Sequence, residues 1–211
     1  MGKNRVGNFH NPIYSNQWHD VVEFRSPDLG YGFAGEPYIY MKCKRETVAA
    51  LCFDPYSRML AMRVEGTLQS NFVPAYKLMS ETMEDTDNGS PAAALMRGLR
   101  EEFGWEYNSS SEEDASHYFF RTITGTYNEM HNYYCSAVVM PGFYERWAAG
   151  QAEFDGDGST GEDRSAIGFI SLSQTNLVND WLFYVVLGLH YAELANSPQY
   201  REFCMLSGIH E

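Results

Sequence analysis

The feature of this 211-residue sequence that most constrains its fold is a helix with both ends marked, between Ser90 and Gly104. Ser90 is of a residue type that caps helix N-termini, and the Pro91 that follows it suits the first helical position. Residues 92–103 are good helix formers apart from Gly98, and Gly104 is a C-terminal stop signal. The sequence therefore predicts a helix over residues 91–103.

Strand-like runs lie on both sides of this helix. Before it, the runs are residues 37–44, 47–53 and 58–64, and the turn signal Asp54-Pro55-Tyr56-Ser57 predicts that the last two form a hairpin. After it come β-rich runs at residues 118–126, 133–140 and 166–172, and then a strongly apolar second helix over residues 179–195. This order predicts an α/β fold, more narrowly an α+β sandwich in which a mixed β-sheet packs with at least two helices.

The chain shows no internal repeat and no low-complexity linker, so one main domain is expected. Residues 1–40 are rich in Gly, Pro, Tyr and Asn, which indicates an N-terminal arm with short strands and turns. We therefore expect an arm over residues 1–40, a domain over residues 41–196, and a C-terminal tail over residues 197–211.

Composition excludes several classes of protein. Hydrophobic residues make up 44% of the chain and charged residues 20%, which is typical of a globular protein. The formal net charge of −13 disfavours binding to a nucleic-acid backbone. It leaves room for a small phosphorylated ligand, because such ligands usually reach an acidic site together with a divalent cation.

The four cysteines show no CxxC spacing, so neither a zinc ribbon nor a redox pair is expected. We expect the cysteines to be reduced thiols. No apolar segment follows the charged N-terminus, and the longest apolar run, residues 181–189, is short of a membrane span. We therefore expect a cytoplasmic protein with no membrane association.

Charged side chains crowd the last two turns of the first helix. Arg97 and Glu101 are neighbours at one-turn spacing, and Arg100 and Glu102 lie beside them. Adjacent carboxylates near a helix C-terminus repel each other and oppose the helix dipole. Something must compensate them, either the two arginines or a bound cation.

These residues resemble the signature box of the Nudix hydrolases. That box ends in Arg-Glu-U-x-Glu-Glu-x-Gly-U, where U is aliphatic or aromatic, and residues 97–105 read R-G-L-R-E-E-F-G-W in the same register. The common lead-in of the family is present as Ser90-Pro91-Ala92-Ala93-Ala94. The resemblance implies the Nudix fold, a mixed β-sheet packed between helices, for the domain over residues 41–196.

The box departs from the family pattern at three positions. Gly98 stands where the family has a glutamate that ligates metal, and Gly89 stands where an earlier box glutamate belongs. The opening glycine of the box falls at Met83 if no insertion intervenes. The degenerate box therefore spans residues 83–105.

The resemblance implies a set of site residues. Arg97 matches the arginine that orients the box glutamates, and Glu101 and Glu102 match the ligands of Mg²⁺ or Mn²⁺. Carboxylates outside the box are available to replace the one missing at Gly98, foremost Glu81, with Glu84, Asp85 and Asp87 in the same loop. Glu162 precedes the last strand, where many members of the family place a further acid that binds metal or acts as general base.

Two functions remain open. The first is a Mg²⁺- or Mn²⁺-dependent pyrophosphohydrolase that cleaves a nucleoside diphosphate linked to another moiety, of the ADP-ribose or nucleotide-sugar type. The second is an inactive Nudix-fold module that binds a nucleotide or a protein partner. In both, a small nucleotide-type ligand is expected. The resemblance also implies a homodimer, because members of that branch often pair through their N-terminal strands.

Overall fold

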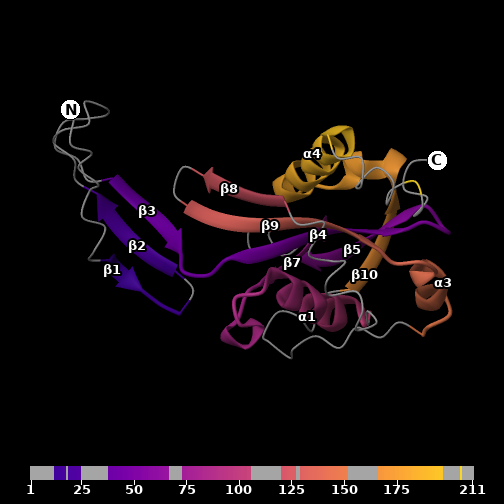
Figure 1. Ribbon diagram of the computed structural model, residues 1–211, viewed down its shortest axis with the longest axis horizontal. Coiled ribbons are helices and arrows are strands. Elements are labelled where there is room, and N and C mark those ends of the chain that lie inside the picture. The colour runs from indigo at the N-terminus through magenta and orange to yellow at the C-terminus, as the bar shows by residue number, and fades with distance from the viewer. Residues whose placement is uncertain are drawn as a thin grey trace. The chain divides into compact units, whose positions relative to one another are not determined.

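The computed structural model describes residues 12–17, 19–24, 38–66, 73–105, 120–126, 129–151, 166–196 and 205. The elements along the chain are β1 (Pro12–Ser15), β2 (His19–Phe24), β3 (Tyr38–Cys43), β4 (Thr47–Asp54), β5 (Met59–Gly66), β6 (Pro74–Lys77), β7 (Met79–Thr82), the 3₁₀ helix η2 (Asp85–Asp87), α1 (Pro91–Phe103), β8 (Phe120–Thr126), β9 (Glu129–Val139), α3 (Phe143–Ala148), β10 (Ala166–Ser171), the 3₁₀ helix η4 (Leu172–Leu177) and α4 (Trp181–Asn196) (Figure 1). The chain divides into two compact units, residues 1–46 with 122–133 and residues 47–121 with 134–211.

The first unit is built from short strands. β1, β2 and β3 pair in antiparallel order, with Val22 opposite Tyr40 at the middle of the β2–β3 ladder. β3 also pairs with the start of β9 in parallel, through Met41 and Glu129. β1 and β2 both lie within the first forty residues.

The second unit contains a sheet in which the strand order is β9-β4-β5-β10, and β7 and β6 pair with β4 and β5. The β4–β5 hairpin is antiparallel, with Phe53 opposite Leu60, and β10 runs antiparallel to β5 along its whole length. β7 pairs with the first half of β4, which places Met79 opposite Ala50 and Glu81 opposite Val48. This last pairing brings β7 to the helix that follows it.

Strand β4 is buried on both faces, since all eight of its residues are buried. Val48 and Ala50 belong to the core cluster that includes Leu95 and Leu99 of α1. Leu51 and Phe53, which alternate with these residues along the strand, line a small apolar cavity together with side chains of α4. Because successive side chains on a strand point to opposite faces, α1 and α4 cover opposite faces of this sheet, as Figure 1 shows. The expected α+β sandwich, a β-sheet packed between helices, is confirmed.

Helix α1 begins and ends at the predicted residues. The Ser90 side chain accepts a hydrogen bond from the backbone N–H of Ala93 at 3.2 Å. At the other end Gly104 has a φ of 59°, in the left-handed region that favours glycine. Its N–H donates to the Arg100 carbonyl at 2.9 Å and that of Trp105 donates to the Leu99 carbonyl at 3.1 Å, which closes the last turn.

The sequence-based prediction missed several elements, among them strand β7 and the short helix α3. Glu81 was assigned to a loop together with Glu84, Asp85 and Asp87, yet Glu81 lies in strand β7. Only the pairing of β7 with β4 makes this segment a strand, since its own residues carry no clear alternation. The short helix α3 was also missed, because six residues give too short a window for a helical period.

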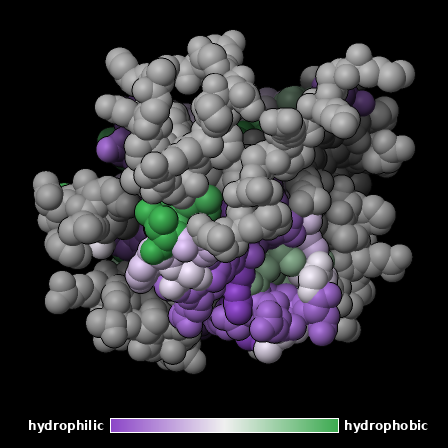
Figure 2. All heavy atoms as spheres, turned by 90° about the vertical axis from the view of Figure 1, so that its left-hand side faces the viewer, coloured by the Kyte–Doolittle hydropathy of each residue, from purple (hydrophilic) through white to green (hydrophobic). Residues whose placement is uncertain are grey.

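On the face that Figure 2 presents, most of the described residues are hydrophilic, and the hydrophobic ones are confined to small areas. No helix within the described ranges is both long enough and apolar enough to cross a membrane.

Candidate functional site beside helix α1

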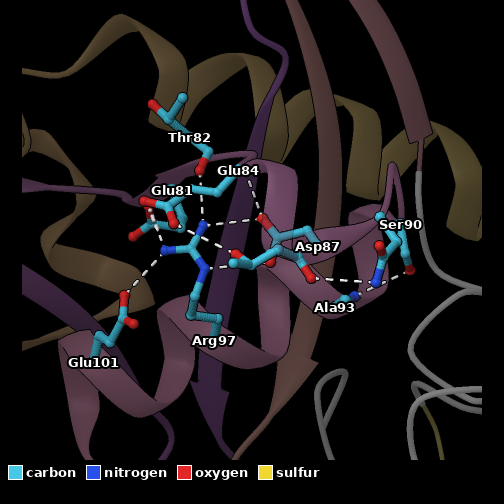
Figure 3. A network of polar contacts seen from close by, with 10 residues as sticks. Glu81, Thr82, Glu84, Asp87, Ser90, Ala93, Arg97 and Glu101 are labelled. Atoms are coloured by element: carbon cyan, nitrogen blue, oxygen red, sulfur yellow. Dashed lines mark hydrogen bonds and ion pairs between the residues drawn. The ribbon is translucent and has the colours of Figure 1, made fainter.

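Arg97 lies at the middle of a group of carboxylates beside α1 (Figure 3). Its Nη1 lies 3.0 Å from Glu81 Oε1 and 3.1 Å from Glu101 Oε2, and its Nη2 donates to the Thr82 carbonyl at 2.8 Å. Glu101 is one turn further along α1, whereas Glu81 and Thr82 end strand β7. The guanidinium therefore ties the helix to the neighbouring strand.

Asp87 is the third carboxylate on this guanidinium. Its Oδ1 accepts from Arg97 Nε at 3.3 Å and its Oδ2 from Nη2 at 3.1 Å. The same Oδ2 accepts from the backbone N–H of Glu84 at 2.7 Å, and the Asp87 carbonyl accepts from the N–H of Ser90 at 2.8 Å. Asp87 therefore fixes both the loop before α1 and the orientation of the arginine.

The turn into α1 needs a left-handed backbone at two successive residues. Asn88 has a φ of 51° and Gly89 a φ of 73°. Residues with a Cβ adopt this region at a cost, and asparagine and glycine tolerate it best. Gly89 occupies the place where the resemblance puts a box glutamate, and the backbone explains its presence. The carboxylate that contacts Arg97 comes instead from Asp87, two residues earlier.

More negative charge surrounds the guanidinium than one arginine neutralises. Burial raises the pKa of the Glu81 carboxyl above its usual value; Arg97 offsets this only in part, and the nearby carboxylates of Glu101 and Glu84 add to the rise. For Asp87, burial acts in the same direction, but hydrogen bonds from Arg97 and from the backbone of Glu84 outweigh it and lower the pKa. Of these two carboxylates, Glu81 is therefore the less completely compensated.

Gly98 lies against β7 with no room for a side chain. A Cβ at this position would come within 2.4 Å of Met79 Cε, 2.9 Å of Glu81 Cβ and 3.1 Å of Glu81 Cγ. Methionine ends move at little cost, but the Cβ of Glu81 is held by the backbone of a paired strand. The stem of Glu81 thus fills the space that a side chain at position 98 would need.

Glu102 lies apart from this group. It is buried, and its carboxylate forms an ion pair with Nε of Arg63 on β5. Nη2 of Arg63 also lies 3.4 Å from the Glu65 carboxylate. The two adjacent glutamates at the end of α1 therefore engage different arginines, Glu101 with Arg97 and Glu102 with Arg63.

The structure brings together three of the five residues that the sequence singled out, namely Glu81, Arg97 and Glu101. Glu102 contacts Arg63 instead, and Glu162 lies outside the described residues. Within the described ranges, no group of three His, Cys, Asp or Glu side chains is arranged closely enough to hold a metal ion. Sequence reasoning named Asp87 only as one acid of the loop; the Glu84-to-Asp87 spacing, typical of a capping pair, was the available signal.

Comparison with known proteins finds similarity in structure alone. No family model matches the sequence, and no curated protein matches it either. The crystal structure of an ADP compounds hydrolase shares 14% identity with this chain, with a TM-score of 0.52, and the match covers 88% of this chain and 90% of that one. The solution structure of the E. coli ORF135 protein shares 16% identity over 73% of this chain and 93% of that one, with a TM-score of 0.47. The chain has a Nudix-like α+β fold.

Proposed function

We propose that the protein is a metal-dependent pyrophosphohydrolase of the Nudix type, acting on a nucleoside diphosphate linked to another moiety such as a sugar. The observation that carries this proposal is that Arg97 contacts Glu101, in the register of the degenerate box, and also Glu81, which lies just before the box. The fold supports it, because one structural neighbour, matching over most of both chains, is an ADP compounds hydrolase.

The donor atoms of this group fit Mg²⁺ or Mn²⁺ in kind. Both ions prefer carboxylate oxygens, and Glu81 and Glu101 offer such oxygens around a single nitrogen of Arg97. The surplus of negative charge around the guanidinium favours a cation there. When bound, the metal would polarise the diphosphate and neutralise its charge.

Within this proposal the residues of the chain have separate tasks. Glu81 and Glu101 would hold the metal, and Arg97 would keep their carboxylates in place, since it contacts both. Asp87 acts through Arg97, because it fixes the guanidinium from the side of the loop. Glu162 is proposed as the general base that would take a proton from the attacking water.

Glu102 takes part in metal binding only if it exchanges partners. Its carboxylate is committed to Arg63, so contact with a cation would require that ion pair to open. This pairing favours the second candidate function, a Nudix-fold module that binds a nucleotide without turnover. The two candidates differ in whether Glu81 and Glu101, without Glu102, suffice for hydrolysis.

Phosphate-coupled turnover decides between them. ADP-ribose, NADH, nucleotide sugars, dinucleoside polyphosphates and nucleoside triphosphates would each be tested with Mg²⁺ and with Mn²⁺. Glu101→Gln should abolish turnover, whereas Glu145→Gln, an exposed glutamate of α3, should leave it unchanged. Absence of turnover on every substrate, with a nucleotide still raising the melting temperature, would favour the binding module.

A further inference from the structure

Helix α4 carries large aromatic side chains on the side that faces solvent. Phe183 and Val186 are fully buried where the helix packs on β4 (Figure 1). On the solvent side, Trp181, Tyr184 and Tyr191 are 49%, 48% and 52% exposed. A helix that is apolar all round is normally covered all round, and large apolar side chains left together on a surface mark a site of interaction.

We propose that two copies of this chain pair through the solvent side of α4, with the two helices antiparallel. The inference goes beyond the proposed function and depends on neither a metal nor hydrolysis. It also differs from the pairing through N-terminal strands that the resemblance implies. Those strands belong to the first unit of the chain, whereas α4 belongs to the second.

The spacing of the exposed residues makes this side of α4 complementary to itself. The exposed positions 181, 184, 188 and 191 follow at intervals of three or four residues, so they form one stripe along the helix. The stripe is symmetric about residue 186, and a twofold axis there places Trp181 of one copy opposite Tyr191 of the other. The same axis places Tyr184 opposite Gly188. Among the described residues, nothing lies within 4 Å of a Cβ built on Gly188, so a large ring faces open space.

The distribution of charge favours a second copy as the occupant of this surface. The chain carries a formal charge of −13, so an oppositely charged partner would be drawn to the acidic parts of the protein. Residues 172–192 contain no lysine or arginine and a single carboxylate, that of Asp180. Its Oδ2 accepts from the N–H of Leu78 at 2.9 Å and its Oδ1 from that of Leu182 at 3.0 Å. His190 is buried. The stripe is therefore an uncharged surface on an acidic protein, where two copies can approach without repulsion between close charges.

Tyr184 is already held in place within one copy. Its hydroxyl donates to the carbonyls of Thr175 and Val178, each at 3.0 Å. Because the hydroxyl is bonded and the side chain fixed, pairing costs little further side-chain entropy. Leu172 and Leu177 of η4 are exposed as well and extend the apolar surface beside the helix. Tyrosine and tryptophan are the residues that most often dominate binding energy at interfaces.

Sedimentation velocity of the full chain, over a wide range of protein concentration, measures the association. The wild type should form a dimer. Trp181→Lys and Tyr191→Glu should each raise the dimer dissociation constant by at least about 10-fold, since each sets an unpaired charge against an aromatic ring of the second copy. Tyr14→Glu on β1 is the matched control, because Tyr14 is 58% exposed, and it should leave the dimer unchanged.

A mixture of the two variants in equal amounts gives the sharper result. In a mixed dimer with antiparallel helices, the lysine introduced at position 181 faces the glutamate introduced at position 191. The other end of the stripe keeps the native pair of Trp181 and Tyr191. The mixture should therefore regain the dimer that each variant alone has lost. With parallel helices, like positions would face each other and mixing would restore nothing.

The remaining outcomes overturn the inference. A wild type that stays monomeric at every concentration would do so, as would a dimer that withstands both substitutions. Dissociation by Tyr14→Glu alone would place the interface at β1, and a mixture without recovery would refute the antiparallel pairing. Circular dichroism checks that each variant folds. If one does not, Gly188→Leu decides: its Cβ has room in the single chain, but its side chain would occupy the place of Tyr184 from the second copy, so an unchanged dimer would refute the pairing.

Discussion

Asp87 accepts hydrogen bonds from Arg97 through both carboxylate oxygens, at 3.3 Å from Nε and 3.1 Å from Nη2. The pair joins the loop before α1 to the middle of the helix, and it leaves Nη1 of the arginine for Glu81 and Glu101. Asp87 thus fixes the guanidinium in place, and the guanidinium in turn holds the carboxylates of Glu81 and Glu101. Substitution of Asp87 should therefore have different effects from substitution of Glu81 or Glu101.

Asp87→Asn should destabilise the protein by about 2 kcal/mol at neutral pH, because a buried charge-assisted pair is lost. The folded-state pKa of Asp87 lies below its usual 3.8, so its contribution is complete above that value and disappears as the pH falls through the folded pKa. Urea unfolding of the two proteins should therefore show a difference that shrinks below pH 3.8. A difference that is independent of pH would contradict the role given to the carboxylate.

Glu102→Gln should destabilise the protein by about 3 kcal/mol, because the largely buried guanidinium of Arg63 would lose the charge of its close carboxylate partner. The double variant Arg63→Met/Glu102→Gln should recover most of that loss, since it removes the charge that is left behind. Thermal unfolding of the single and double variants checks this. If Glu102→Gln is as stable as wild type but does not bind Mn²⁺, Glu102 belongs to the metal site instead.

Gly98→Ala should lower the unfolding free energy by about 1–3 kcal/mol, although alanine is the better helix former. The reason is the added Cβ, which would lie 2.4 Å from Met79 Cε and 2.9 Å from Glu81 Cβ. Gly188→Ala on α4 is the control, since nothing lies within 4 Å of a Cβ there. That substitution should raise stability by up to about 1 kcal/mol, and equal effects at both positions would refute the packing argument.

Cysteine alkylation should distinguish the described thiols. Burial raises the pKa of Cys52, and raises that of Cys135 to about 11, so both are thiols at neutral pH and lie inside the second unit. Cys43 is half-buried and should react first. Mass spectrometry of peptides after a short pulse of iodoacetamide measures the order, and faster labelling of Cys52 than of Cys43 would show that β4 is less protected than its burial indicates.

The local elements of this protein were predictable because their signals are local. The turn signal at residues 54–57 predicted the β4–β5 hairpin, and Ser90 and Gly104 predicted both ends of α1. Each of these signals acts over a few residues through backbone conformation and capping, so the rest of the chain is not needed to recognise it.

The partners of the charged side chains were only partly predictable. Arg97 and Glu101 share a helix face, so their pairing followed from one-turn spacing. Glu102 was expected to share a site with Glu101, yet its carboxylate pairs with Arg63. Arg63 belongs to strand β5, which precedes the box in the sequence. Adjacent residues on a helix point in directions about 100° apart, so position in the box alone does not place them in one site.

The sequence by itself determined the α+β order, the limits of α1 and the residues available for a carboxylate site, because these depend on local conformation and composition. Only the tertiary structure decided which carboxylate takes which position. The pairing of β7 with β4 brings Glu81 over Gly98, and the left-handed turn at Asn88 and Gly89 brings Asp87 to Arg97. Both depend on where a strand or loop docks against the helix, which the packing of the whole sheet sets.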